Sequence, residues 1–368
     1  MPATENVVLA INAGSSSVKF ALYLMKGSRE NVLFSGSLND VPKNESLANW
    51  LTRQPGFDQV TAIAHRVVHG MGHSRPEAVT PDLIKELKSL ISYDPEHLPA
   101  EIELMELFVK KFPDLPQFAC FDTMFHQTMP LVAQTLAIPR KYQQKGIRRY
   151  GFHGISYQYL TEQLKRLTQG GVLNDRVIIA HLGSGASLAA IKNGQSIDTS
   201  MGFTPGAGIP MSTRSGDIDP GLASYLLKHE KLSPTQFNYM VNHEAGLMGV
   251  SETSADISEL LKIRDTDNRA AEAVNLFCYQ VSKYIGAYAA ALGGLDTLVF
   301  SGGIGEHLPE IREQVCHNLG FLGIRLDNHK NLKNADIISN GRVHVRVMAT
   351  NEALMMARLI TRTLTNDI

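Results

Sequence analysis

The sequence has almost no excess of charge, which argues against two classes of partner. Its 368 residues include 35 basic and 36 acidic side chains, for a net charge of -1. Nucleic acids and anionic membranes are bound by basic surfaces, so we expect neither as a partner. Long apolar runs are also missing: no stretch approaches the roughly 20 residues that span a bilayer. The first residues show no basic region of a signal peptide.

Cysteine is scarce, and its pattern argues against a disulfide framework. The three cysteines, Cys120, Cys278 and Cys316, are odd in number and show no CxxC spacing. Such cysteines are typical of proteins in a reducing compartment, where they pack as small apolar groups. We therefore expect three buried thiols and a cytoplasmic protein.

The sequence contains one pattern in two copies, which are separated by about half the length of the chain. Residues 7–10 lead into a Gly-Ser pair at 14–15, and residues 177–180 lead into a Gly-Ser pair at 183–184. An apolar, β-branched run that ends in Gly-Ser and is followed by a second apolar run predicts two strands and a tight turn. Such a turn can bring backbone N–H groups against a phosphate. Two related lobes that face a phosphate chain would explain the repeat, and so would two ordinary hairpins.

The order of predicted strands and helices is also similar in the two halves of the chain. Strands are expected at 7–12, 17–25, 31–38, 60–68, 116–122, 176–182, 186–192, 296–301 and 343–349. Helices are expected at 80–92, 98–112, 156–168, 219–229, 233–245, 255–263, 268–292, 307–319 and 351–364. Because strands precede helices in each half, and the length exceeds the usual size of one core, the sequence predicts a duplicated α/β fold of two lobes with a cleft.

Polar residues that suit phosphoryl transfer lie at the ends of these elements. Arg66 follows an apolar strand, Asp122 ends another, and His153 precedes a helix. Arg214 lies in a polar loop, and Glu352 begins the last helix. Guanidinium groups bind anions, carboxylates bind metal ions, and glycine turns hold polyphosphate. Together these residues predict phosphoryl transfer.

Several polar residues also have a simpler structural explanation. His65 and His69 have the spacing of zinc ligands, but the cation Arg66 stands where a zinc protease motif has an acid, which disfavours zinc. Asp217 is expected to cap the helix that follows Arg214. Two further histidines are as consistent with a hydrogen-bonded scaffold as with a catalytic role: His126 and His181.

Four motifs together resemble a known family. They are Asn12–Phe20, Phe121–His126, Tyr150–Gly154 and Thr213–Pro220. In these motifs, and in order from residue 12 to residue 358, the chain resembles the acetate and propionate kinases of the acetokinase group, in the superfamily of acetate and sugar kinases, Hsp70 and actin. The resemblance implies a duplicated ribonuclease-H-like fold, the actin-like ATPase fold, with an interdomain cleft that closes on substrates.

The resemblance also implies a reaction and a division of the chain. The enzyme would transfer a phosphoryl group from ATP to a short carboxylate, acetate first, and give acyl phosphate and ADP with Mg2+ (or Mn2+). Residues 1–123 and 353–368 would form the N-terminal lobe. Residues 124–352 would form the C-terminal lobe, which binds nucleotide and makes a homodimer.

Individual roles carry over on residues that match the family's motifs. Arg66 and Arg214 would hold the carboxylate and the transferring phosphoryl group. Asp122 would orient the acid or reach the metal through water, and His153 would donate to the phosphoryl oxygens. The implied metal ligands are Asn12 and Glu352. The implied acid contacts are Arg66, Val68, His97, Phe152 and Pro205. The implied nucleotide contacts are Ser15, Ser17, Lys19, His181, Gly183, Ser184, Gly185, Asp256, Ile257, Ser258, Gly303, Ile304 and His307.

The chain departs from the family's usual residues near both substrates. Glu96 stands where an apolar residue is usual and would place a carboxylate by the acyl pocket, which leaves propionate, butyrate or a more polar acid open as the acceptor. Ser184, Ser258 and His307 also replace usual residues, which leaves the phosphoryl donor open. A non-catalytic, nucleotide-binding relative of actin or Hsp70 is the alternative from another class, and the paired arginines and acids argue against it.

Overall fold

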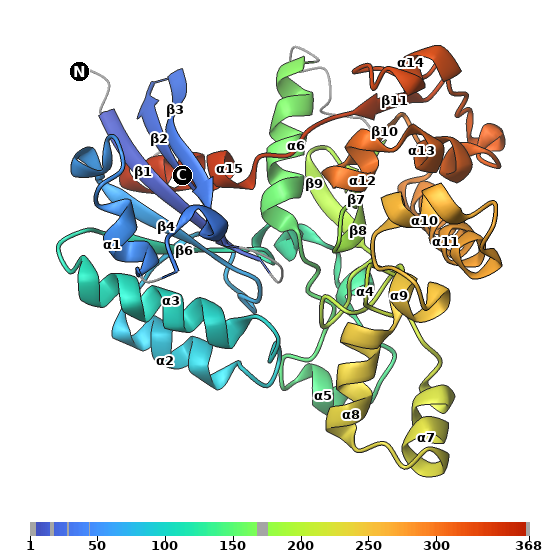
Figure 1. Cartoon of the computed structure of the whole chain (residues 1–368), viewed down its shortest axis with the longest axis horizontal. Coiled ribbons are helices and arrows are strands. Elements are labelled where there is room, and N and C mark those ends of the chain that lie inside the picture. The colour runs from blue at the N-terminus through green and yellow to red at the C-terminus, as the bar shows by residue number, and fades with distance from the viewer. Residues whose placement is uncertain (1–4, 15–17, 28, 44, 168–175, 366–368) are drawn as a thin grey trace. The chain divides into compact units, whose positions relative to one another are not determined.

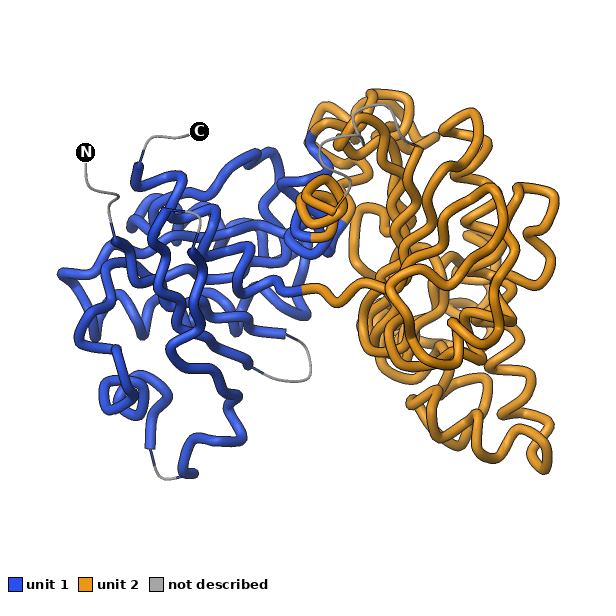
Figure 2. The backbone as a smooth tube through the Cα atoms, turned by 90° about the horizontal axis from the view of Figure 1, so that it is seen from above, with its two compact units in different colours: residues 1–127, 152–159, 351–368 blue, residues 128–151, 160–350 orange. Residues whose placement is uncertain are grey.

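The chain folds into two compact units, each with its own mixed sheet (Figure 2). The structure, a computed structural model, describes residues 5–14, 18–27, 29–43, 45–167 and 176–365. Unit 1 comprises Met1–Gln127, Phe152–Tyr159 and Asn351–Ile368, and unit 2 comprises Thr128–Gly151 and Leu160–Thr350. All three cysteines are buried and free, as expected.

Unit 1 is built on a six-stranded sheet in the order β3-β2-β1-β4-β6-β5. Its strands are β1 (Glu5–Ala13), β2 (Val18–Lys26), β3 (Arg29–Ser37), β4 (Ala62–Val67), β5 (Glu77–Ala78) and β6 (Gln117–Phe121). Its helices are α1 (Leu47–Leu51), α2 (Pro81–Ser89), α3 (Leu98–Lys111), α15 (Glu352–Thr365) and the start of α6 (Gly154–Leu167), with short 3-10 turns at Leu38–Asp40, Phe57–Gln59 and Met124–Thr128. Although α15 is the last helix of the chain, it packs against β1 and β2, the first two strands (Figure 1).

Strand β1 lies at the centre of this sheet and buries side chains on both faces. Val8 belongs to one apolar cluster together with Met355 of α15, whereas Leu9 belongs to a second cluster together with Leu51 of α1. Successive side chains of a strand point to opposite faces, so two clusters on one strand mean that both faces are covered. This explains why β1 reads as a continuous apolar run rather than an alternating one.

Unit 2 is built on a five-stranded sheet in the order β11-β10-β7-β8-β9. Its strands are β7 (Arg176–Leu182), β8 (Ala186–Lys192), β9 (Gln195–Thr199), β10 (Thr297–Ser301) and β11 (His344–Val347). Its helices are α4 (Leu131–Gln134), α5 (Arg140–Gln143), α7 (Pro220–His229), α8 (Pro234–Tyr239), a π-helical turn (Met240–Glu244), α9 (Gly246–Ser251), α10 (Ile257–Ile263), α11 (Asn268–Leu292), α12 (Gly302–His307), α13 (Pro309–Cys316), a 3-10 turn (Gly320–Leu322) and α14 (Asn328–Leu332). In the described part of the chain, no helix is long and apolar enough to cross a membrane.

The two sheets have the same topology, which confirms the predicted duplication. The order β3-β2-β1-β4-β6 in unit 1 corresponds to β9-β8-β7-β10-β11 in unit 2. In each unit the first strand pairs antiparallel with the second and parallel with the fourth in this correspondence. The two Gly-Ser pairs fall between corresponding strands, after β1 and after β7.

Every strand and helix expected from the sequence has a counterpart, and the expectation missed only short elements. Among the described residues, these are β5, β9, α1, α4, α5, α9, α12 and α14. Strand β9 is short and polar at its ends, so its sequence alone does not predict a strand. It forms because it pairs with β8.

The compact units differ from the predicted lobes in three segments. Phe152–Tyr159 belongs to unit 1, because the N–H of Gly154 donates to the carbonyl oxygen of Asp122 over 2.9 Å at the end of β6. Residues 124–127 also belong to unit 1, since they continue directly from β6. Residues 351–352 join it because they begin α15.

Candidate functional site

Two parallel strands of unit 1 end side by side, and a charged residue stands at each end. Strands β4 and β6 pair in parallel, with Arg66 opposite Cys120, and Asp122 is the first residue after β6. The carboxyl ends of parallel strands gather at one edge of a sheet. Nη2 of Arg66 donates to Oδ2 of Asp122 over 2.6 Å, and its Nε lies 3.2 Å from each carboxylate oxygen. The guanidinium group is thus held by a forked contact.

Strand β1 and helix α15 add two polar side chains at the same edge. Oδ1 of Asn12 accepts from Nη1 of Arg66 over 3.0 Å, and its Nδ2 donates to Glu352 over 2.6 Å. The side chain of Asn351 accepts from a backbone N–H of the first turn of α15 and from the hydroxyl of Tyr23. This cap fixes the helix end from which Glu352 projects. We call Asn12, Arg66, Asp122 and Glu352 the unit 1 cluster.

Burial governs the electrostatics of the unit 1 cluster. The side chain of Arg66 is 11% exposed and that of Asp122 is 1% exposed. Burial alone would lower the pKa of Arg66, but the charges of Asp122 and Glu352 outweigh it and raise that pKa. Burial raises the pKa of Asp122, and the contact with Arg66 opposes the rise. Two carboxylates against one guanidinium group leave the cluster able to take up a further cation.

His153 stands at a strained turn beside Asp122. Its φ is 57°, in the left-handed region that residues other than glycine seldom adopt. Its backbone N–H bonds to the carboxylate of Asp122. A Cβ on Gly154 would lie 2.0 Å from the carbonyl oxygen of Asp122, so only glycine fits at that position. The backbone therefore fixes His153 at the start of α6, next to the unit 1 cluster.

Three residues implied for acid binding are buried in unit 1: Val68, His97 and Phe152. Nε2 of His126 donates to the carbonyl oxygen of Phe152 over 3.0 Å, so His126 is part of the scaffold of this wall. Nδ1 of His97 lies 2.9 Å from Oδ1 of Asp94. This hydrogen bond fixes the orientation of the His97 ring.

Glu96, which the sequence analysis expected by the acyl pocket, is exposed. Asp94 is buried against His97, and Glu101 is buried one turn further along α3. Both carboxylate oxygens of Glu101 accept from the backbone N–H of Val68, over 3.1 and 3.3 Å. Burial, and then the nearby charge of Asp94, raises the pKa of Glu101 well above its usual value.

In unit 2, the second glycine turn is tied to the loop that carries Arg214. The N–H of Gly183 donates to the carbonyl oxygen of Gly185 over 3.1 Å and closes the turn between β7 and β8. Ser184 at its tip is exposed, and its carbonyl oxygen accepts from the N–H of Ser212 over 3.2 Å. The turn and the Arg214 loop therefore share a backbone connection.

The Arg214 loop is held on both sides by backbone hydrogen bonds. The N–H of Met211 donates to the carbonyl oxygen of Arg214 over 2.9 Å, and the N–H of Ala245 donates to that of Thr213 over 3.0 Å. Nη1 of Arg214 lies 3.4 Å from the carbonyl oxygen of Pro205. Pro205, which was implied for acid binding, is thus a neighbour of Arg214 in unit 2.

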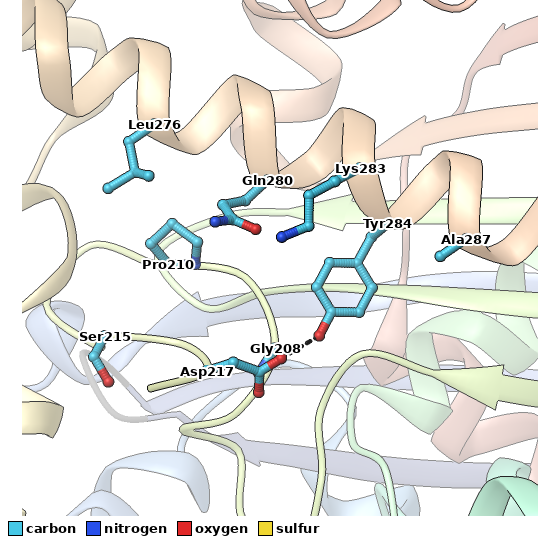
Figure 3. Close-up of a pocket in the computed structure, with 9 residues that line it drawn as sticks. All are labelled: Gly208, Pro210, Ser215, Asp217, Leu276, Gln280, Lys283, Tyr284 and Ala287. Carbon is cyan, nitrogen blue, oxygen red and sulfur yellow. Dashed lines mark hydrogen bonds between the residues drawn. The ribbon is translucent and has the colours of Figure 1, made fainter. Parts of the chain in front are cut away.

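A pocket of about 380 Å³ lies between the same loop and α11 (Figure 3). Its lining residues are Gly208, Pro210, Ser215, Asp217, Leu276, Gln280, Lys283, Tyr284 and Ala287. Asp217 accepts from the N–H of Gly208 over 2.9 Å and from the hydroxyl of Tyr284, so it closes the base of the loop. The expectation that Asp217 caps α7 was wrong. The cap is Asp219, because Pro220 occupies the first position of the helix.

Residues implied for adenosine binding lie at the starts of two helices of unit 2. Asp256 caps α10 by accepting from the N–H of Ser258 over 2.7 Å, and Ile257 is buried. Gly303 and Ile304 lie in α12, directly after β10. Both sets therefore lie at helix N-termini, and the N–H of Gly302 at the start of α12 donates to the side chain of Glu306 over 2.9 Å.

The far end of α12 is held by a buried arginine that the sequence analysis did not identify. Arg312 is fully buried, and its Nη1 donates to the carbonyl oxygens of Gly305 and Glu306 over 2.8 and 3.0 Å. Its Nε and Nη2 donate to the side chain and the carbonyl oxygen of Asn331, each over 2.8 Å. A single arginine on an amphipathic helix gives no sequence signal that distinguishes this role from a surface charge.

The remaining candidates are placed as follows. Lys19 lies opposite Asn12 in the β1–β2 ladder, His181 is half-buried at the end of β7, and His307 is exposed as the last residue of α12. Ser15 and Ser17 lie outside the described residues. Nε2 of His65 bonds to Gln117 over 2.9 Å, so this histidine has a structural partner in the core of unit 1.

The candidates thus fall into two groups, one in each unit. Unit 1 brings together Asn12, Arg66, Val68, His97, Asp122, Phe152, His153 and Glu352. Unit 2 holds His181, Gly183, Ser184, Gly185, Pro205, Arg214, Asp256, Ile257, Ser258, Gly303, Ile304 and His307.

Comparison with known proteins gives a consistent result. The sequence model of the acetokinase family matches residues 46–358. The chain is 38% identical to an acetate kinase of Rhodopseudomonas palustris, over 97% of this chain and 98% of that protein. It is 39% identical to a propionate kinase of Citrobacter koseri, over 98% and 97%. The crystal structure of Porphyromonas gingivalis acetate kinase is similar with a TM-score of 0.86 and 34% identity, over 98% of this chain and 100% of that one.

Proposed function

Because this chain belongs to the acetokinase family, we propose that it transfers a phosphoryl group from ATP to acetate, reversibly, and gives acetyl phosphate and ADP. The observation that carries the proposal is the unit 1 cluster, in which Arg66 is buried, forked against Asp122 and linked through Asn12 to Glu352. An anion-binding guanidinium group and two carboxylates in one cluster are what phosphoryl transfer to a carboxylate requires.

The two arginines would bind the groups that carry negative charge during transfer. Arg66 would bind the acid, since its fork suits a planar carboxylate, and Arg214 would donate to the equatorial phosphoryl oxygens. His153 would donate to the same oxygens from the start of α6. Asp122 would orient Arg66 and the acid, and no base is needed, because a carboxylate nucleophile has no proton to lose. Removing one donor to the transition state costs a few kcal/mol in comparable enzymes, about 100-fold or more in turnover.

The donor chemistry of the unit 1 cluster fits a hard divalent cation. Mg2+ prefers oxygen ligands, keeps several waters and is held by one or two carboxylates together with phosphate oxygens. Glu352 and Asp122 would supply the carboxylates, and Asn12 would steer Glu352 through its 2.6 Å hydrogen bond. Bound Mg2+ (or Mn2+) would neutralise charge on the phosphate oxygens.

The nucleotide would bind to unit 2. The turn of Gly183 and Gly185 would bind the phosphate groups, as the family resemblance implies, and its hydrogen bond to the Arg214 loop supports this role. The starts of α10 and α12 would receive the adenosine. Ser15, Ser17, Lys19, His181 and His307 are proposed as further contacts on the family resemblance alone.

Propionate is the second candidate acceptor, because a propionate kinase is among the similar proteins. The wall of Val68 and Phe152 is apolar, and one extra methylene changes binding to such a wall by only about 1–3 kcal/mol. A more polar acid is a third candidate acceptor, which rests on the family resemblance that would place Glu96, exposed in this structure, by the acyl pocket.

A panel of acids tests the proposed function. ADP release is followed with ATP and Mg2+ in the presence of acetate, propionate, butyrate and a short hydroxy acid. We expect the highest kcat/KM with acetate, and a higher value for propionate would replace it. If no acid supports ADP release while ATP still binds, the non-catalytic alternative is favoured.

We also propose that the protein is a cytoplasmic homodimer that associates through unit 2. Three helices of unit 2, α7, α8 and α11, carry exposed large apolar or aromatic side chains: Leu222, Tyr225, Tyr239, Leu276 and Tyr279. Three buried free thiols support a reducing compartment. Light scattering would measure a single-chain mass if the dimer were wrong.

A further inference from the structure

Helix α3 carries one carboxyl group on its buried face. Leu98, Ile102 and Met105 pack in an apolar cluster of unit 1, and Glu101 lies among them on the same helix with 3% of its surface exposed. A buried carboxyl group is unfavourable unless hydrogen bonds compensate it. The compensation here comes from the backbone N–H of Val68, which lies 3.1 and 3.3 Å from the two oxygens of Glu101.

The peptide group that Glu101 binds joins the ends of two strands. Val68 is the first residue after β4, so its N–H lies just beyond the strand and needs another acceptor. The carbonyl oxygen on the other side of the same peptide, that of Val67, accepts from the backbone N–H of Asp122 over 2.9 Å. Glu101, the peptide between Val67 and Val68, and Asp122 therefore form a continuous chain of hydrogen bonds.

This chain ends at the groups that would bind the acid. Arg66 precedes the peptide, and Asp122 both accepts from Arg66 and donates its N–H to the peptide. A rotation of the peptide would move the end of β4 relative to the end of β6. Fixing a binding group to within a fraction of an ångström requires support from the residues behind it.

We propose that Glu101 is a positioning residue of the acid site, which fixes Arg66 and Asp122 by holding the peptide between Val67 and Val68. The proposal rests on the proposed function and deepens it. The proposal requires that an oxygen of the side chain at position 101 lies within hydrogen-bond distance of the N–H of Val68. The negative charge is dispensable, because an amide oxygen at the same place accepts the same hydrogen bond.

Two conservative variants separate the length of the side chain from its ability to ionise. Glu101→Gln keeps the length and an acceptor oxygen but cannot ionise. Glu101→Asp keeps the carboxyl group but is shorter by one methylene, about 1.5 Å, and cannot hold the N–H in the same geometry. Ile102→Val is the matched control, since it perturbs the neighbouring position of the same buried helix face without touching the peptide.

The measurement is the KM for acetate, the KM for ATP and kcat, each taken well below the thermal unfolding midpoint of the variant. A buried N–H left without its acceptor costs roughly 5- to 100-fold in an equilibrium. We therefore expect Glu101→Asp to raise the KM for acetate about 10-fold or more and to lower kcat. We expect less than a 2-fold change in the KM for ATP, because the residues proposed to bind adenosine are in unit 2.

The kinetic constants of the three variants either support or overturn the positioning role of Glu101. Glu101→Gln and Ile102→Val should stay within about 3-fold of the wild type in every constant. If Glu101→Gln loses acetate affinity and Glu101→Asp keeps it, the carboxyl group rather than the length of the side chain is required, and the proposal is overturned. Equal effects of all three variants in proportion to lost stability would show a packing role only. Absence of any acid kinase activity in the wild type would instead contradict the proposed function.

Discussion

Replacing Arg66 by lysine separates the charge of this residue from its forked shape. Arg66 makes four N–H···O contacts, three to Asp122 and one to Asn12. A lysine ammonium keeps the positive charge beside the buried Asp122, but it reaches only part of these acceptors. Removing the charge altogether, as in Arg66→Ala, leaves the buried carboxylate of Asp122 without a counter-charge. This lowers the free energy of unfolding by about 3–5 kcal/mol. Losing one or two charge-assisted hydrogen bonds, as in Arg66→Lys, costs about 2–3 kcal/mol.

The chain offers a local probe for this experiment. Its single tryptophan, Trp50, lies in α1 of unit 1, so its fluorescence in urea reports the unfolding of the unit that contains Arg66. The matched control is Arg75→Lys, because Arg75 is exposed and its Nε lies 3.5 Å from the carboxylate of Glu77. We expect the control to unfold within about 0.5 kcal/mol of the wild type.

Activity should respond differently from stability. Lysine restores part of the free energy of unfolding relative to alanine, but it cannot bind a planar carboxylate with two parallel donors. Both variants should therefore lose about 100-fold or more in kcat/KM for acetate. If Arg66→Lys keeps kcat/KM within 10-fold while its stability falls, the fork serves the fold alone and the reasoning about acid binding is refuted.

Two further predictions concern buried groups outside the unit 1 cluster. Burial lowers the pKa of His65 from its usual 6.5 to about 4, so the unfolded chain binds the extra proton between these values. The stabilisation that comes from a neutral, buried His65 is complete above about pH 6.5 and is lost as the pH falls towards 4. Between pH 7 and 5, the free energy of unfolding of the wild type should therefore fall by about 2 kcal/mol more than that of His65→Gln. Urea unfolding followed by the fluorescence of Trp50 measures both. Equal losses would contradict this. Arg312→Met leaves several buried acceptors at the end of α12 unpaired, so we expect a loss of about 3–5 kcal/mol from unit 2 and a higher KM for ATP. A thermal midpoint by circular dichroism within 2 °C of wild type would contradict it.

The sequence predicted the strands and helices well because their apolar periods are long and end at glycine, proline or capping residues. The charged residues at strand ends were found for the same reason, since Arg66 and Asp122 directly follow apolar runs. Asp217 was assigned the wrong role although the signal was present. A proline at 220 marks the first helical position and makes Asp219 the cap.

Other parts of the site give no local signal. Asn12 and Glu352 are 340 residues apart, and their hydrogen bond forms only because α15 returns to pack on β1. The role of Glu101 depends on the N–H of Val68, 33 residues away, which has no acceptor once β4 has ended. Long-range contacts of this kind follow from the fold rather than from any pattern within one element.

The duplication explains why one edge of each sheet carries the candidate residues, and why the two edges have different chemistry. By topology β4 of unit 1 corresponds to β10 of unit 2. Arg66 lies at the end of the first, whereas the second runs into Gly302, whose positive φ starts α12. An arginine at a strand end can bind a small anion by charge, and a glycine at a strand end lets the backbone approach a larger ligand closely. Under the proposed function, the corresponding edges of the two sheets would therefore bind the acid in unit 1 and the nucleotide in unit 2.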